Sequence, residues 1–352
     1  MSRQAWLLVI LFFFIAIKGY AVKVADLPEV NRADFIRIDG NDLFVADSKS
    51  FCIYVYSLET LKLKLQIGKR GEGPGEFQHP PQLNAVLPDT IWCSGGWKTL
   101  VFSRDGKLLQ EKTFPPLQGL NITPIKNNFV AVDWNTDWQL RLTFKSVHLL
   151  NLKFEKIKEI YKVQSDTNFI TPNDTGEEEF HVITHTFFFL INEDKIFIVD
   201  SKKGFFIDVF DANGNHLYAI DKKLEPVNVK EAQKPKILDS LYLNYKELTR
   251  IKKKSAFTFY DTYPPIRQAW IDNGKIYATT YKENKGTNEM IILDLKGNIL
   301  KTIMIPIKST KDYKVQGEFD TYTVNKNVLY EVIEDEQTGN WSLIKTDLSS
   351  IK

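Results

Sequence analysis

Short runs of apolar residues recur along the chain between polar turns. The recurring unit is an apolar strand, a short polar turn, a second apolar strand, a turn containing Gly or Asn, and a third strand. Six copies centre on residues 42–56, 90–102, 128–150, 195–210, 275–294 and 327–345. A small sheet of short strands cannot bury both of its faces alone, so such sheets are expected to stack around an axis. The pattern predicts an all-β fold, a six-bladed β-propeller.

Two stretches are longer than a blade requires, since propeller blades usually repeat about every 40–50 residues. One insertion, at about 164–182, is polar and loop-like, and the other, at about 222–265, contains an amphipathic pattern. Apolar residues recur in the second insertion at spacings of three and four: Ile237, Leu241, Tyr242, Tyr245, Leu248 and Ile251. This spacing predicts a helical insertion between blades 4 and 5.

The two ends of the chain are expected to meet in one blade. The last copy ends at its third strand, whereas the strand-like segment Val22–Leu27 has no partner in the first copy. A ring of sheets removes exposed edges by closing. Residues 22–28 are therefore predicted to complete the final blade beside Trp341–Thr346.

The first residues have the composition of an export signal. Arg3 precedes the unbroken apolar run Leu7–Ile17, and Gly19 and Ala21 are small residues suited to cleavage. Eleven apolar residues at about 1.5 Å each are too short to span a hydrocarbon core of about 30 Å. We expect a signal peptide over 1–21 and a single exported domain over 22–352, periplasmic or extracellular. An uncleaved N-terminal anchor is the alternative.

Composition and charge narrow the choice of partners. The 352 residues include 46 Lys and Arg against 44 Asp and Glu, a net charge of +2. This balance does not favour nucleic acid or an anionic membrane surface as a partner, and no integral membrane span is expected after signal cleavage.

Cys52 and Cys93 are the two cysteines, which excludes a thiolate metal cluster. Both lie in apolar strand-like runs and are expected to be buried free thiols, although export permits a disulfide.

The stretch Leu65–Pro80, LQIGKRGEGPGEFQHP, carries a more specific signal than the strand pattern. It resembles the Gly-rich connection between blades of NHL-repeat propellers, and Leu43–Ser48 resembles the strand-Ala-Asp element of that repeat. With the export signal and the helical insertion, the chain is similar to exported bacterial six-bladed propeller proteins. The resemblance implies the propeller fold. Because a strand rather than a helix follows this loop, the residues favour a structural role, with Phe77 wedged between blades, over phosphate binding.

Candidate binding residues come from the expected position of the loops. In a propeller, the loops between second and third strands and between successive blades lie on one face, and several tryptophans fall in or beside these loops. They suggest a platform for a sugar ring, a peptide or another flat ligand, and packing between blades is the alternative. The predicted ligand-binding residues are Arg70, His79, Trp97, Asp133, Trp134, Trp138, Lys202 and Tyr281.

No catalytic constellation emerges from the sequence. Asp133 and Asp137 could act as paired carboxylates, but Asp is also an ordinary turn residue. His181 and His185 lie four residues apart, and on an extended strand that is about 13 Å, too far to share one zinc ion. No catalytic residue, metal ligand or cofactor is therefore predicted, and a divalent metal stays an alternative.

These observations favour a non-enzymatic function. The prediction is an exported propeller that binds a protein, peptide or glycan partner through its loop-rich face. A channel-centred hydrolase or lyase, metal-dependent or not, is the alternative, and it would require polar side chains from several blades to converge.

Overall fold

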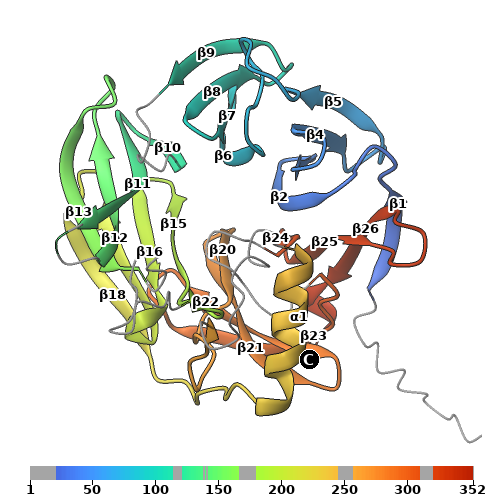
Figure 1. Cartoon of the computed structure of the whole chain (residues 1–352), viewed down its shortest axis with the longest axis vertical. Helices are drawn as coiled ribbons and strands as arrows, with labels where there is room; N and C mark the ends of the chain where they lie inside the picture. Colours follow the sequence, from blue (N-terminus) through green and yellow to red (C-terminus); the bar gives the residue numbers. More distant parts are fainter. Residues whose placement is uncertain are drawn as a thin grey trace, which may run out of the picture.

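Six antiparallel sheets of four strands each are arranged around a central axis (Figure 1). The computed structural model describes residues 21–113, 121–137, 139, 142–165, 180–244, 257–309 and 320–351. The predicted six-bladed β-propeller is confirmed.

Each blade runs from an inner first strand to an outer fourth strand. Blades 1 and 2 contain β2 (Ala33–Asp39), β3 (Asp42–Asp47), β4 (Cys52–Ser57), β5 (Leu63–Ile67), β6 (Gln82–Val86), β7 (Thr90–Gly95), β8 (Lys98–Ser103) and β9 (Leu108–Thr113). Blades 3 and 4 contain β10 (Asn121–Ile125), β11 (Asn128–Asp137), β12 (Leu142–Leu150), β13 (Lys156–Gln164), β15 (Phe187–Asn192), β16 (Lys195–Asp200), β17 (Phe205–Asp211) and β18 (His216–Lys222). Blades 5 and 6 contain β20 (Gln268–Asp272), β21 (Lys275–Asn284), β22 (Thr287–Asp294), β23 (Ile299–Ile305), β24 (Tyr322–Asn325), β25 (Val328–Glu334), β26 (Trp341–Asp347) and β1 (Val22–Asp26).

The middle strands are apolar on both faces because each blade packs between two neighbours. In β3, Leu43 packs in a cluster with Leu343 of blade 6, whereas the next residue, Phe44, packs in a cluster with Ile91 and Cys93 of blade 2. Successive side chains of a strand point to opposite faces. A strand buried on both faces therefore reads as a continuous apolar run.

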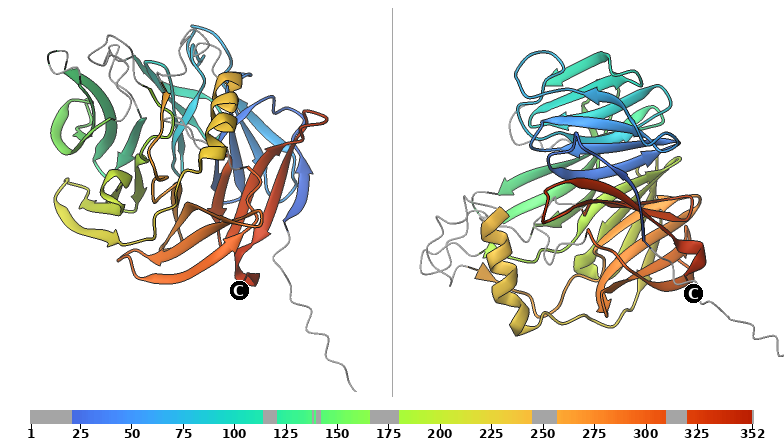
Figure 2. Two further views of the ribbon diagram at one scale, coloured as in Figure 1. Left: turned by 60° about the horizontal axis from the view of Figure 1, so that its bottom comes forward. Right: turned by 90° about the vertical axis from the view of Figure 1, so that its right-hand side faces the viewer.

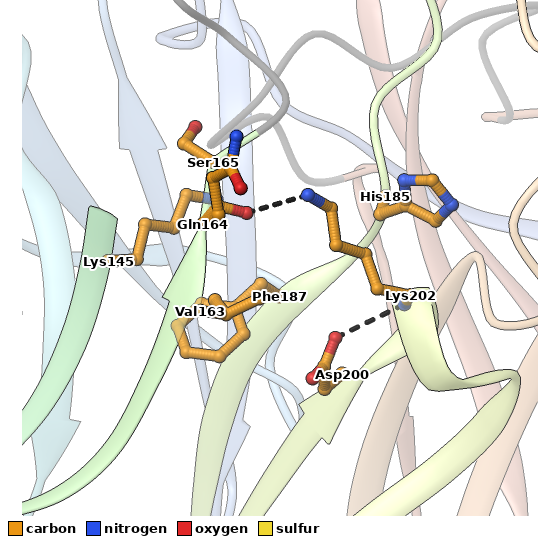
Figure 3. A pocket seen from close by; sticks show the side chains of 8 residues that line it. All are labelled: Lys145, Val163, Gln164, Ser165, His185, Phe187, Asp200 and Lys202. Atoms are coloured by element: carbon orange, nitrogen blue, oxygen red, sulfur yellow. Dashed lines mark hydrogen bonds between the residues drawn. The ribbon is translucent and has the colours of Figure 1, made fainter. Parts of the chain in front are cut away.

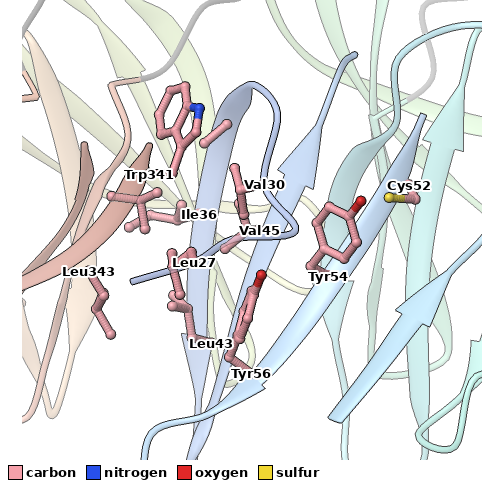
Figure 4. Close-up of a cluster of buried hydrophobic side chains, with 12 residues drawn as sticks. Leu27, Val30, Ile36, Leu43, Val45, Cys52, Tyr54, Tyr56, Trp341 and Leu343 are labelled. Carbon is pink, nitrogen blue, oxygen red and sulfur yellow. The ribbon is translucent and has the colours of Figure 1, made fainter. Parts of the chain in front are cut away.

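The N-terminal strand closes the ring. β1 pairs antiparallel with β26, with Ala25 opposite Leu343 and Asp26 opposite Ser342. The amide of Leu27 then donates to the carbonyl of Trp341 at 2.8 Å. Leu27, Trp341 and Leu343 meet side chains of blade 1 in one buried cluster (Figure 4). The predicted closure beside Trp341–Thr346 is confirmed.

The two insertions meet above blades 4 and 5. β14 (Phe180–His181), between β13 and β15, pairs in parallel with β19 (Phe257–Thr258), between β18 and β20. The second insertion also holds η2 (Glu231–Gln233) and α1 (Lys234–Asn244), which confirms the helical insertion. Tyr245, Leu248 and Ile251 of the predicted apolar pattern lie outside the described residues. The insertions share a buried cluster of Val182, Ile183, Val229, Ile237, Phe257, Tyr263 and Tyr281.

The strand order divides the connections between two faces of the ring. Connections from second to third strands and from blade to blade lie on one face, which we call the loop face. The opposite turn face carries the short turns, together with the start of β1 and the C-terminal turn η5 (Leu348–Ser350). Figure 2 shows α1 on the side of the ring away from the C terminus.

Two expectations from the sequence concern the cysteines and the membrane. Cys52 and Cys93 are both free and buried. Burial raises the pKa of the Cys52 thiol to about 11.

Among the described helices, none is long and apolar enough to cross a membrane. Residues 1–20, which carry the predicted signal peptide, lie outside the described part of the chain.

Replacing Leu27 with Ala tests the closure. Leu27 is 1% exposed and packs between the closing strand and blade 1. The substitution leaves a cavity and is expected to lower the free energy of unfolding by about 2–5 kcal/mol, measured by urea denaturation. Leu152→Ala, at a residue 67% exposed on the turn face, should change it by less than about 0.5 kcal/mol. Equal effects of the two substitutions would contradict the packing role of Leu27.

Candidate functional site

The Gly-rich loop between blades 1 and 2 is folded around Phe77. Phe77 is fully buried among side chains of both blades, and its amide donates to the carbonyl of Lys69 at 2.8 Å. Gly68 has φ +71°, and a Cβ there would lie 2.2 Å from the Phe77 ring. Only glycine fits such a close approach in the left-handed region. The predicted wedge between blades is confirmed.

Two carboxylates hold the same loop in place. Glu76 accepts a hydrogen bond from the Gly73 amide at 2.8 Å and pairs with Lys69 at 3.1 Å, and both interactions lower its pKa. Glu111 of β9 accepts from the Gly75 amide at 2.9 Å and pairs with Lys98 at 2.8 Å. Side chains thus fix the backbone of the loop at several points.

Trp97 and His79 form an exposed aromatic pair on the loop face. Trp97 lies in the turn between β7 and β8 and is 48% exposed. The His79 ring lies 6.2 Å from it, centroid to centroid. Gly96 has φ +70°, and a Cβ there would lie 2.3 Å from the His79 ring. This turn therefore requires glycine beside the histidine. We call Trp97 and His79 the aromatic pair.

Arg70 lies in the Gly-rich loop and contacts blade 1. Its guanidinium carbon is 4.9 Å from the centroid of the Phe51 ring, a cation–π contact. Arg70 itself is exposed. Three of the predicted binding residues, Arg70, His79 and Trp97, are therefore exposed on loops of blades 1 and 2.

Asp133 and Trp134 are neighbours in β11 but face opposite sides of blade 3. Asp133 is buried and accepts hydrogen bonds from His148 Nε2 at 3.0 Å and from Lys156 Nζ. Burial raises the pKa of Asp133, but these bonds outweigh burial and bring it below its ordinary value. Asp137 lies four residues further along the same strand, about 13 Å at 3.3 Å per residue. The two carboxylates therefore do not form a joint site.

Trp134 contacts Lys145, which lines a narrow cleft between blades 3 and 4. Lys145 Nζ lies 4.8 Å from the Trp134 ring centroid and 5.4 Å from that of Phe187. Lys202, in η1 (Ser201–Lys203), donates from Nζ to the Gln164 carbonyl at 2.7 Å across the cleft (Figure 3). The cleft is lined by Lys145, Val163, Gln164, Ser165, His185, Phe187, Asp200 and Lys202. Its volume of about 10 Å³ is that of a single water site.

Tyr281 lies in the interior at the junction of blade 5 with the insertions. Its ring stacks on Tyr263 at 4.5 Å, and the Arg267 guanidinium lies 4.9 Å from its centroid. Burial raises the pKa of the Tyr281 phenol. Arg267 in turn donates to both carboxylate oxygens of Asp320, at 2.8 and 3.0 Å. Tyr281 is therefore covered by the insertions rather than displayed on the loop face.

The two histidines of the first insertion both contact Tyr260. His181 stacks on the Tyr260 ring at 4.7 Å, and His185 lies 4.8 Å from the same ring. Within the described residues, no three His, Cys, Asp or Glu side chains gather as metal ligands. Trp138, the remaining predicted binding residue, lies outside the part of the chain that the structure describes.

Glu331 holds the loop that follows β23. Its side chain is fully buried, and Oε1 accepts from the amides of Lys308 and Ser309 at 2.7 and 3.1 Å. Oε2 has no hydrogen-bond partner among the described atoms. Burial raises the pKa of this carboxyl, although the two amides lower it in part. Neither Glu331 nor the Arg267–Asp320 pair stands out in the sequence, because their partners are distant along the chain.

The six four-stranded sheets define a six-bladed β-propeller, and comparison with known proteins agrees. A family model described as a 6-bladed β-propeller matches residues 25–263, so the chain belongs to that family. No curated protein matches the chain.

Solved structures of two proteins from Bacteroides are similar to the chain. A Bacteroides fragilis protein that is described as exported has 14% identity and a TM-score of 0.52, with 94% of each chain covered. A protein of unknown function from Bacteroides caccae has 14% identity and a TM-score of 0.42, with 89% of this chain and 92% of that chain covered. At these identities the likeness to the B. fragilis protein shows the fold alone.

Replacing Asp320 with Ala tests the buried ion pair. The substitution leaves the Arg267 guanidinium buried without its carboxylate and is expected to lower the free energy of unfolding by about 3–5 kcal/mol. The double variant Arg267→Met, Asp320→Leu should recover much of that loss, because it removes both charges. Urea denaturation measures both effects. A loss below about 0.5 kcal/mol in Asp320→Ala would argue against a buried pair.

The raised pKa of Glu331 predicts a specific pH dependence. Because the folded-state pKa lies above the ordinary value of 4.5, the folded state binds this proton more tightly than the unfolded state. The contribution of Glu331 to stability is therefore full below pH 4.5 and is lost as the pH rises through the folded-state pKa. Glu331→Gln should remove this part of the pH dependence of the unfolding free energy. Glu336→Gln, at an exposed turn residue, should leave it unchanged, and equal pH profiles of Glu331→Gln and wild type would refute the assignment.

Proposed function

We propose that this protein is an exported, non-enzymatic propeller that binds a protein, peptide or carbohydrate partner through its loop face. The observation that carries the proposal is the exposed Trp97 beside His79 on a fixed turn of that face. Exposed aromatic side chains supply a large contact area and lose few rotamers on binding.

The turn that carries Trp97 and the loop beside it are held in place by their neighbours, which supports a binding role for this exposed side chain. Gly96 holds the turn against His79, and the neighbouring Gly-rich loop is fixed by Glu76 and Glu111. A surface that is ordered before binding pays little conformational entropy when the partner arrives. Arg70, also exposed, extends this surface toward blade 1 with a group suited to carboxylates and aromatic rings.

The connections on the loop face are longer than those on the turn face, which also supports binding at the loop face. The turn face has short hairpin turns such as Gly40–Asn41 and Asn273–Gly274, whereas both long insertions join the loop face. Binding residues are found disproportionately on loops held by a rigid scaffold. The insertions add a surface of their own above blades 4 and 5.

Export is the second part of the proposal. The apolar run Leu7–Ile17 with its flanking residues supports a cleaved signal, and the similar B. fragilis structure is described as an exported protein. The NHL-like loop Leu65–Pro80 suggests descent from NHL-repeat propellers. A periplasmic or extracellular site would place the loop face among envelope or extracellular partners.

Trp97→Ala tests the binding function. Wild-type protein should bind at least one member of an array of peptides and glycans, and loss of a central aromatic contact should weaken that binding by about 2 kcal/mol, or roughly thirtyfold. Titration of the selected member, followed by calorimetry, measures the affinity. Leu152→Ala is the matched control, since it removes an exposed apolar side chain from the turn face. Unchanged affinity in Trp97→Ala, or an equal loss in Leu152→Ala, would reject the aromatic pair as the contact.

A further inference from the structure

A second hollow lies away from the aromatic pair, where the N-terminal strand closes the ring. It has a volume of about 360 Å³, within the range of about 300–1,000 Å³ that is usual for small-molecule sites. β1, β26 and the turn between β25 and β26 form its walls. The lining residues are Lys23, Asp26, Pro28, Asp335, Thr338, Asn340, Trp341 and Ser342. We call this hollow the seam groove.

The polar groups of the seam groove are mostly oxygen atoms. Asp26 Oδ1 is bound by Lys23 Nζ at 2.5 Å and by Ser342 Oγ at 3.2 Å. Asp335 Oδ1 accepts from the amides of Gln337 and Thr338 at 2.9 and 3.0 Å. These bonds lower the pKa of both carboxyls, so both are ionised acceptors at neutral pH. All of these contacts are made to the Oδ1 atoms.

Asn340 adds a donor to this set of acceptors, beside the largely buried Trp341. Asn340 is exposed, and its side-chain amide can both donate and accept. Trp341 is 8% exposed, and its Nε1 has no hydrogen-bond partner among the described residues. Buried indole N–H groups usually have a partner. Carboxylate acceptors beside amide and hydroxyl groups suit a ligand that presents several hydroxyls close together.

From this geometry we infer that the seam groove binds a small polyhydroxylated molecule, such as a monosaccharide. The Oδ2 atoms of Asp26 and Asp335 accept hydrogen bonds from its hydroxyls, and Asn340 donates to a ring or hydroxyl oxygen. Like the aromatic pair, the seam groove lies on the loop face, so in its carbohydrate class the inference rests on the proposed function. It nevertheless names a separate site, because it lies on blade 6 and does not involve Trp97 of blade 2.

Binding in the seam groove is coupled to closure of the ring. Asp26 belongs to β1, whereas Asp335 and Asn340 belong to the turn before β26. A ligand that bonds to both sides holds the N-terminal strand against the last blade. Because such a ligand binds the closed ring and not the unfolded chain, it raises the melting temperature, and the rise continues with the logarithm of ligand concentration above Kd.

The test uses the purified chain with glucose, galactose and N-acetylglucosamine as probes. Calorimetric titration and thermal melting are expected to show binding of at least one probe with a matching rise in melting temperature. Asn340→Ala and Asp335→Asn should each weaken that binding about tenfold, the effect of one lost hydrogen bond. Asp335→Asn retains Oδ1 and with it the hydrogen bonds of the turn. Asn213→Ala, at an exposed asparagine of a turn on the opposite face, should bind as wild type does.

Several outcomes would overturn the assignment. Absence of binding by all three sugars rejects the ligand class. Binding that survives both Asn340→Ala and Asp335→Asn rejects the seam groove. Binding that Trp97→Ala abolishes while the groove variants retain it moves the sugar to the aromatic pair, which would support the proposed function and refute this inference. Loss of sugar binding in the groove variants, with Trp97→Ala unchanged, supports the inference whatever partner the aromatic pair binds.

Discussion

The whole structure depends on the antiparallel pairing of β1 with β26. Every blade buries both of its faces against neighbours, so the ring has no sheet that can end at solvent without exposing an apolar face. The first and last segments of the chain meet in one sheet, and Leu27 fastens the connection between that sheet and blade 1. Closure therefore gives each of the six sheets an apolar cluster on both of its faces.

Burial of the middle strands confines function to the ends of the blades. The side chains of β3 and of the corresponding strands in the other blades pack against neighbours on both faces. Partners must therefore be bound by the loops. The loop face is held by polar contacts that cross long sequence distances, such as Glu111 with Gly75 and Arg267 with Asp320. These contacts fix loops whose own sequences have little preference for one conformation.

The fold could be predicted from sequence because its determinants are local and periodic. Apolar strand runs, glycine turns and an unpaired N-terminal strand can each be recognised in short stretches of sequence. The helix over Lys234–Asn244 could be recognised by its apolar spacing of three and four. The Gly-rich loop was also interpretable, since Gly68 and Phe77 are close together both in the chain and in space. Local pattern and tertiary structure agree wherever contacts are short in sequence.

The site was harder to predict, because loop membership does not decide which way a side chain points. Asp133 and Trp134 are adjacent, yet Asp133 bonds to His148, whereas Trp134 packs against Lys145, which lines the cleft toward blade 4. Tyr281 belongs to a hairpin of the loop face, but the insertions cover it with Tyr263. Lys145 and His185 approach the cleft from different blades, which no single-sequence pattern could reveal.

Closure and recognition also share residues at the seam of the ring. Asp26 pairs through its backbone with Ser342 in the closing sheet, and its carboxylate accepts from the Ser342 hydroxyl at the wall of the seam groove. A change in the position of β1 would therefore change the groove as well as the packing of Leu27. By contrast, the aromatic pair lies on blade 2 and is held by its own glycine turn. The same ring thus carries one surface that is linked to its closure and another that is held by local contacts.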